Sequence, residues 1–253
     1  MKLKIISFPI FLAFLCKSLT FNLKGRTLTN YLSNLQPNIA CEETISAVLA
    51  FAEASIEISN KVKTYNIDKS FDYLNSDTVL NPSGELQKTF DLFCDDIIRE
   101  RLRNSKTSKG LPSVCLYVSE ELKEPIIFDD KGIAVFCDPL DGSSNLDFSI
   151  ATGTIFTIAQ VNRNHLDDID LFFNNKPIRN SILAAGYFMY SSSTEFLLSF
   201  GGSTNCFSLN PNNNEYILTY SDVKCPSRGP YYSLNEARSG DWPDGLIRYD
   251  VNC

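Results

Sequence analysis

Apolar and polar residues alternate along this chain with two different periods, the first of which predicts helices. Between Ala40 and Lys61 apolar residues recur at helical spacing, and Glu42 and Glu43 in the first turn suit the positive end of a helix dipole. A second helical pattern follows the turn at Pro82 and continues to Arg103. These two segments therefore predict amphipathic helices in the first half of the chain.

Short apolar runs predict strands in the second half. Val114–Val118 and Ile133–Cys137 are continuous apolar runs that stop at polar turn formers, as strands buried on both faces do. Similar patterns predict further strands at Gly153–Val161, Ile182–Tyr187, Asn205–Leu209 and Glu215–Tyr220, the last two as a hairpin. Ser191–Phe200 has a Ser/Thr-rich start and an apolar body, which predicts a capped helix.

Composition and charge narrow the class of protein. The chain has 253 residues, of which 43% are hydrophobic and 21% charged, as in ordinary globular proteins. The net charge is −7 and no basic cluster stands out, which weighs against nucleic-acid binding. An acidic protein that handles an anionic substrate needs local positive charge, and metal ions are the obvious source.

The eight cysteines do not form a metal-binding pattern. No pair has the C-x-x-C spacing, and Cys115 and Cys137 lie inside predicted strands. Buried free thiols are therefore expected and a zinc site is not. Disulfides are expected only if the chain enters an oxidising compartment.

The N-terminal segment, residues 1–20, predicts a targeting signal. Lys2 and Lys4 precede an apolar run, Ile5–Cys16, which is too short to span a bilayer and suits a secretory signal. An ordinary apolar helix and a two-part signal that routes to a plastid remain alternatives; without a signal a cytoplasmic location is expected. No stable membrane span is expected after removal of the signal.

Pairs of acidic residues follow the first two predicted strands. Glu120 and Glu121 come just after the first, and Asp138 and Asp141 after the second. Carboxylates are the ligands that Mg²⁺ prefers, and the small residues that follow Asp141 can offer backbone amides and hydroxyls to a phosphate. Taken alone, each acidic pair is equally consistent with solvated surface charge.

The string Asp-Pro-Leu-Asp-Gly-Ser-Ser-Asn at residues 138–145 resembles the signature of fructose-1,6-bisphosphatases, within the metal-dependent, lithium-sensitive phosphomonoesterases. Ser119-Glu120-Glu121 is similar to another motif of that family, and the resemblance continues in order from about Thr27 to the end. It implies a layered α/β sugar-phosphatase fold. Residues 24–222 would form a large N-terminal phosphatase domain with a mixed sheet, and residues 223–253 the beginning of an incomplete C-terminal α/β domain.

The resemblance also implies a set of site residues. It implies two or three Mg²⁺ ions, with Mn²⁺ as a substitute, and Glu121 and Asp91 as the catalytic groups that take the proton of the attacking water. The implied metal ligands are Glu85, Glu120, Glu121, Asp138, the Leu140 carbonyl and Asp141. The implied substrate-binding residues are Asp141, Gly142, Ser143, Ser144, Asn145 and Asn235.

The implied function is hydrolysis of the 1-phosphate of fructose 1,6-bisphosphate in carbohydrate metabolism. Asn145 favours this sugar over sedoheptulose bisphosphate, and inositol-phosphate phosphatases, which typically have Asp-Pro-Ile-Asp-Gly-Thr, fit less well. Family members are usually tetramers, so a homo-oligomer is expected. At the family's AMP-binding positions this chain has Cys41 in place of glycine, and Gly132-Ile133 in place of a Lys-Tyr pair, which weighs against inhibition by AMP.

The pattern ends at Cys253, before the family's last sugar-binding segment. A C-terminally truncated relative is therefore expected. The alternative to an active enzyme is an inactive paralogue, or a binding partner of a full-length subunit.

Overall fold

The computed structural model describes residues 25–67, 82, 89–162, 165, 172–173, 177–229, 240 and 242–251. The chain divides into two compact units, of which the first ends at Val223. The second runs from Lys224 to Cys253 and contains the helix α6 (Asp244–Val251). The expected targeting segment, residues 1–20, lies outside the described residues. Its assignment and the domain limits at residues 24, 222 and 223 remain predictions.

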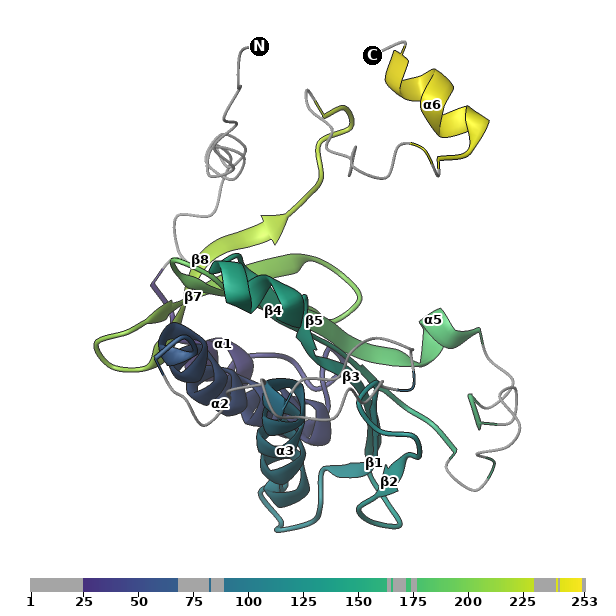
Figure 1. Cartoon of the computed structure of the whole chain (residues 1–253). Coiled ribbons are helices and arrows are strands. Elements are labelled where there is room, and N and C mark those ends of the chain that lie inside the picture. The colour runs from purple at the N-terminus through teal and green to yellow at the C-terminus, as the bar shows by residue number, and fades with distance from the viewer. Residues whose placement is uncertain are drawn as a thin grey trace. The chain divides into compact units, whose positions relative to one another are not determined.

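The first unit is built on a mixed sheet whose eight described strands have the order β2-β1-β3-β4-β5-β6-β7-β8 (Figure 1). β1 and β3 run parallel, and every other neighbouring pair is antiparallel. The strands are β1 (Val114–Ser119), β2 (Ile126–Ile127), β3 (Ile133–Asp141), β4 (Thr152–Ala159), β5 (Ile182–Tyr190), β6 (Thr194–Ser199), β7 (Thr204–Asn210) and β8 (Glu215–Val223). The predicted mixed α/β class is confirmed.

Three helices lie on one side of this sheet (Figure 1). They are α1 (Leu28–Ser33), α2 (Glu42–Thr64) and α3 (Thr89–Asn104). α2 and α3 pack alongside each other, α2 against β5 and α3 against β1 and β3. Two short helices, η4 (Ser143–Phe148, a 3₁₀ helix) and α5 (Ile178–Ser181), lie in connections. No helix among the described residues is long and apolar enough to cross a membrane.

Aromatic rings fill the space between the helices and the sheet. Phe188 on β5 stacks on Phe196 of β6 with ring centres 4.1 Å apart, and Phe51 on α2 stacks on Phe156 of β4 at 4.2 Å. None of these four side chains is more than 1% exposed. Each contributes about 1.5–3 kcal/mol by leaving water. The helix-covered side of the central strands is therefore the main core.

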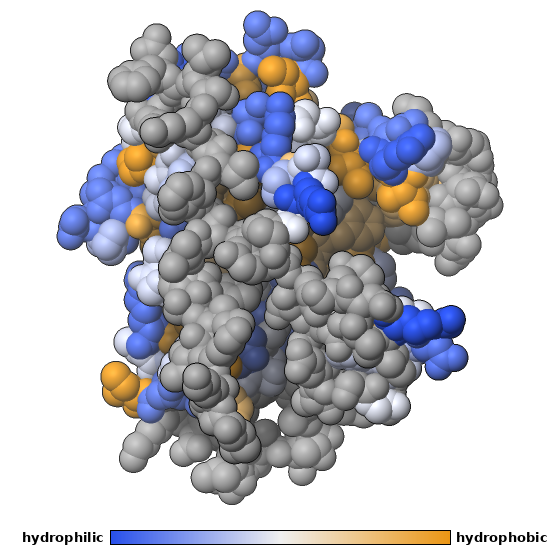
Figure 2. Space-filling model, turned by 90° about the horizontal axis from the view of Figure 1, so that it is seen from above, coloured by the Kyte–Doolittle hydropathy of each residue, from blue (hydrophilic) through white to orange (hydrophobic). Residues whose placement is uncertain are grey.

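The opposite side of the central strands keeps apolar side chains at the surface. Ile155 on β4 and Tyr187 and Met189 on β5 alternate with the buried phenylalanines and are 47%, 42% and 37% exposed. In Figure 2 apolar residues (orange) reach the surface between polar ones (blue). Among the described residues, no helix covers these three side chains as α1–α3 cover the other face.

One edge strand of the sheet is very short, and the other is partly covered. β2 is only two residues long. At the other edge, residues 25–27 run beside β8: the Gly25 N–H donates to the Leu218 carbonyl at 3.2 Å, and the Leu218 N–H donates to the Arg26 carbonyl at 2.8 Å. Thr27 forms a bridge with Ile217. Open strand edges promote pairing between molecules, and these features limit it.

The prediction of a helix at Ser191–Phe200 is wrong, because Thr194–Ser199 forms strand β6. Thr194, Phe196 and Leu198 are buried and alternate with half-buried residues, which is the period of a strand. The serines before them form a turn in which the Ser191 N–H donates to the Ser193 carbonyl, rather than a helix cap. Pairing with β5 and β7 on both sides decides the outcome.

Candidate metal and phosphate site

The predicted acidic residues lie together where two parallel strands end. Ser119, the last residue of β1, is the register partner of Cys137 on β3. Glu120 and Glu121 follow directly after Ser119, and the Glu120 N–H donates to the Cys137 carbonyl at 3.2 Å. Asp138 follows Cys137 on the neighbouring strand. In open α/β sheets ligands bind at this carboxyl end of the strands.

Asp138 and Asp141 lie within β3, whereas the sequence pattern predicted a turn from Pro139 onward. The pairing of β3 with β4 shifts between Asp138 and Asp141, so Pro139 and Leu140 occupy a bulge. A bulge tolerates proline because the missing N–H is not needed for pairing. The Leu140 N–H donates to the Asp138 carboxylate at 3.1 Å, and the Thr154 hydroxyl donates to the Pro139 carbonyl at 2.8 Å. The bulge therefore fixes both aspartates on one strand.

The acidic residues repel one another around Asp138. The pKa of the Asp138 carboxyl is raised to about 7, first by burial and then by the neighbouring Glu120, Asp141 and Glu121, and the hydrogen bond from Leu140 offsets part of this rise. Like charges at short range disfavour the ionised form in this way. A cation bound among these carboxylates would relieve the repulsion.

The donor chemistry fits a divalent metal ion. Glu120, Glu121, Asp138 and Asp141 offer carboxylate oxygens, which Mg²⁺ and Mn²⁺ prefer. In the part of the chain that the structure describes, no three His, Cys, Asp or Glu side chains already converge as a metal cage. Glu120, Asp141 and Glu121 nevertheless lie close enough to Asp138 to raise its pKa.

Asp91 and Glu121, the predicted catalytic pair, are both buried at this end of the sheet. Asp91 on α3 is 3% exposed and Glu121 is 8% exposed. Both act on the Cys94 thiol, whose pKa is raised first by burial and then by Asp91, Asp95 and Glu121. The Ser143 hydroxyl donates to the Asp91 carboxylate at 3.3 Å. α3 thus places Asp91 in contact with Ser143, which is a predicted substrate-binding residue.

The turn after β3 requires its glycine. Gly142 has a φ of +74°, a backbone angle that residues with a side chain rarely adopt. A Cβ at this position would lie 3.1 Å from the side-chain amide nitrogen of Asn145. The Asn145 N–H donates to the Gly142 carbonyl at 2.8 Å, and its side-chain amide donates to the Ala151 carbonyl at 3.0 Å. Ser144 is exposed. This turn closes on itself and begins η4 next to Asp141.

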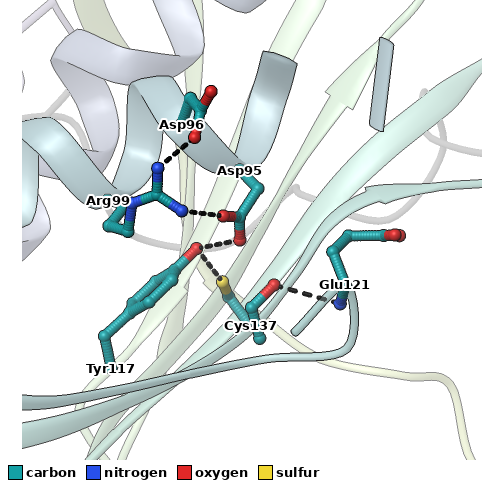
Figure 3. A network of polar contacts seen from close by, with 7 residues as sticks. Asp95, Asp96, Arg99, Tyr117, Glu121 and Cys137 are labelled. Atoms are coloured by element: carbon teal, nitrogen blue, oxygen red, sulfur yellow. Dashed lines mark hydrogen bonds and ion pairs between the residues drawn. The ribbon is translucent and has the colours of Figure 1, made fainter. Parts of the chain in front are cut away.

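A buried polar network outside the predicted site joins α3, β1 and β3 near Glu121 (Figure 3). The Tyr117 hydroxyl donates to the Asp95 carboxylate at 2.7 Å, and the Cys137 thiol donates to the Tyr117 oxygen at 3.2 Å. Arg99 forms ion pairs with Asp95, at 3.1 Å, and with Asp96. Two signals in the sequence could have indicated it. Asp95 lies one helical turn after Asp91, and Tyr117 is a polar residue in a strand predicted to be buried on both faces.

Glu85, a predicted metal ligand, and Asn235, a predicted ligand of the 6-phosphate, both lie outside the described residues. Their roles remain predictions.

Asp138→Asn is expected to stabilise the metal-free protein at pH 8. The pKa of this carboxyl rises from an unfolded value near 3.8 to about 7 in the folded chain, so the ionised form is disfavoured by folding. The penalty is complete above pH 7 and is lost as the pH falls toward 4. Water screens this half-buried group, so we expect a gain of about 1 kcal/mol, or a few degrees in melting temperature.

This expectation can be measured by thermal unfolding with a chelator at pH 8 and pH 4.5. Glu124→Gln, at an exposed position in the loop after β1, is the matched control and should change little. A gain from Asp138→Asn that is the same at both pH values would contradict repulsion as its cause.

Comparison with known proteins identifies relatives of one kind. The sequence profile described as "Fructose-1-6-bisphosphatase, N-terminal domain" matches residues 26–221. The cytosolic fructose-1,6-bisphosphatase of Solanum tuberosum is 37% identical over 179 residues, which are 68% of this chain and 49% of the relative. The fructose-1,6-bisphosphatase of Schizosaccharomyces pombe is 36% identical over 173 residues, covering 68% and 47%. The chain thus spans about half the length of the curated relatives it matches.

Solved structures of a fructose-1,6-bisphosphatase have a similar fold. The crystal structure of Leishmania major fructose-1,6-bisphosphatase in its holo form superposes with a TM-score of 0.75 and 26% identity. The match covers 90% of this chain and 68% of that one. The structure of the same protein in its apo form superposes with a TM-score of 0.72.

Proposed function

The chain belongs to the fructose-1,6-bisphosphatase family, and we propose that it is a metal-dependent phosphatase that hydrolyses the 1-phosphate of fructose 1,6-bisphosphate. The observation that carries the proposal is the gathering of Glu120, Glu121 and Asp138 where β1 and β3 run parallel, with Asp141 at the end of β3. Four carboxylates repelling one another suit a site that works with cations. The adjoining turn at Gly142 suits an anion that those cations would bind.

Glu120, Glu121, Asp138 and Asp141, with the Leu140 carbonyl, would hold two or three Mg²⁺ ions. When bound, these ions supply the positive charge that stabilises charge developing on the phosphate and on the attacking water. The protein's own contribution is to hold the carboxylates in place. The Leu140 N–H in the bulge holds the Asp138 side chain, and the Cys137 carbonyl on β3 holds the Glu120 backbone.

Glu121 and Asp91 would take the proton from the attacking water. Both are almost fully buried, and both belong to rigid elements or their immediate ends. The Glu121 N–H donates to the Ser119 hydroxyl oxygen at 3.2 Å, and Asp91 accepts a hydrogen bond from Ser143. A positioned base contributes about 10²–10⁴-fold to a rate.

The turn after Asp141 would bind the phosphate. Gly142 lets the backbone approach an anion without a side chain in the way, and Ser143 and Ser144 add hydroxyl donors. Asn145 closes the turn through Ala151 and so would shape the substrate pocket. Asn235 would contact the 6-phosphate. The names of the plant relatives support a cytosolic location, and a homo-oligomer is proposed from the family.

The function is tested by phosphate release from fructose 1,6-bisphosphate by the full chain. We expect release with Mg²⁺ that stops on addition of a chelator, with fructose 6-phosphate as the sugar product. Asp138→Ala and Asp141→Ala are the controls for contaminating phosphatases. Sedoheptulose 1,7-bisphosphate and an inositol monophosphate, compared under the same conditions, test the choice of substrate.

Two results would contradict the proposal. Release by the wild-type chain that equals release by Asp138→Ala would favour the inactive paralogue instead. Faster release from either of the other two substrates would move the assignment to that substrate.

A further inference from the structure

The buried network near Glu121 joins three elements that each carry a site residue. Asp95 belongs to α3, which carries Asp91; Tyr117 belongs to β1, which leads into Glu120 and Glu121; and Cys137 belongs to β3, next to Asp138. The side chains of Asp95, Tyr117 and Cys137 form one continuous chain of hydrogen bonds, 2.7 Å and 3.2 Å long (Figure 3). We name these three residues the Asp95–Tyr117–Cys137 chain.

The same region holds the backbone of both glutamates. The Ser119 hydroxyl oxygen accepts the Glu121 N–H at 3.2 Å, and this side chain lies close enough to Asp95 to lower the pKa of that carboxyl. The Cys137 carbonyl accepts the Glu120 N–H at 3.2 Å. The Cys137 end of the hydrogen-bonded chain therefore holds the Glu120 backbone directly, and Ser119, near the Asp95 end, holds the Glu121 backbone.

The direction of each hydrogen bond is fixed by protonation. The Cys137 thiol donates to the Tyr117 oxygen at 3.2 Å. Burial raises the pKa of Tyr117, so its hydroxyl keeps its proton and donates to Asp95. Arg99 supplies positive charge to the carboxylate at the far end.

Packing alone does not account for this arrangement. Tyr117 is 0% exposed and Asp95 1% exposed, and polar groups withdrawn from water in this way gain little net stability over apolar residues of the same shape. What hydrogen bonds add is direction, because a fully satisfied network fixes one arrangement of the elements that it joins. Tyr117 and Cys137 lie diagonally across β1 and β3, where a shift between the strands would separate Glu120 from Asp138.

We propose that the Asp95–Tyr117–Cys137 chain is a positioning device, which sets the spacing of the metal-binding carboxylates on β1 and β3 relative to α3. The proposal rests on the proposed metal site. Its three residues are not among the proposed metal-binding or substrate-binding residues and would act through Glu120, Glu121 and Asp138. Groups that orient metal ligands in this way typically change metal affinity by about 10–100-fold when removed.

The test is Mn²⁺ binding to the full chain, followed by electron paramagnetic resonance of the free ion. Tyr117→Phe removes one hydroxyl and keeps the ring; we expect Mn²⁺ affinity to fall about tenfold. Tyr216→Phe is the matched control. Tyr216 on β8 is also buried, and its hydroxyl is hydrogen-bonded to Ser55 on α2 at 2.7 Å. It should lose thermal stability to a similar extent and leave Mn²⁺ affinity within about twofold.

A second pair of variants tests the thiol. Cys137→Ser keeps a donor to Tyr117 and is expected to retain the wild-type affinity within about threefold. Cys137→Val keeps the volume, removes the donor, and is expected to weaken Mn²⁺ binding severalfold.

Each outcome decides the proposal. Wild-type affinity in Tyr117→Phe, an equal loss in Tyr216→Phe, or no saturable Mn²⁺ binding by the wild-type chain would overturn it. If the wild-type chain binds Mn²⁺ but releases no phosphate, the proposed function fails, whereas a selective loss of Mn²⁺ affinity in Tyr117→Phe still supports the positioning device.

Discussion

Replacing Glu121 by glutamine is expected to lower kcat for phosphate release about 10²–10³-fold at saturating Mg²⁺, with little change in KM. Glutamine has nearly the same shape as glutamate and can still accept hydrogen bonds, but it cannot take a proton from water. Because Glu121 is also a proposed metal ligand, the Mg²⁺ concentration needed for half-maximal rate should rise as well. Measuring rates over a series of Mg²⁺ concentrations separates the two effects.

The control for this variant is Glu124→Gln, in the same loop after β1 but exposed. It should keep kcat within about twofold of the wild type, since surface substitutions usually change little. A Glu121→Gln variant whose kcat is fully restored by additional Mg²⁺ would exclude Glu121 as the proton acceptor and leave it only as a metal ligand.

Phe196→Ala is expected to lower the free energy of unfolding of the chain by about 3–5 kcal/mol. Phe196 is fully buried and stacks on Phe188 at 4.1 Å, and its ring also lies near Phe156, Phe207 and Tyr216, between 5.7 and 6.1 Å away. Removing the ring leaves a cavity where β5, β6 and β7 meet α2. Unfolding by urea, followed by circular dichroism, measures the loss.

Leu197→Ala is the matched control, because Leu197 is the next residue on β6 and points to the opposite, less covered side of the sheet. It should cost only about 1 kcal/mol, since less of its surface leaves water on folding. Equal losses in the two variants would mean that the two faces of β6 are buried to the same degree, contrary to the structure.

The sequence predicted the elements whose pattern is strong over a short range. Apolar runs that end in acidic residues located β1, β3 and the four carboxylates, and helical spacing located α2 and most of α3. Buried Cys115 and Cys137 were likewise expected and are free thiols in the structure. Each of these predictions depends on residues only a few positions apart in the sequence, so a local pattern is enough to make it.

Features that depend on distant partners were missed or misread. The Ser/Thr-rich start and apolar body of Ser191–Phe200 predicted a capped helix, whereas pairing with β5 and β7 makes Thr194–Ser199 a strand. Pro139 was read as a turn former, whereas β4 pairs around it as a bulge. Asp95, Tyr117 and Cys137 lie far apart in the sequence, and no local pattern connects them.

The short run of residues 25–27 beside β8 sets a boundary for shortened versions of this protein. A chain that starts at residue 24 or earlier keeps the Gly25 and Arg26 backbone bonds to Leu218, and the sheet edge stays paired. A protease cut or an engineered start a few residues later would remove that cover and also Thr27, whose hydroxyl caps α1 by accepting the Asn30 N–H. Shortened versions of this protein should therefore keep residues 25–27.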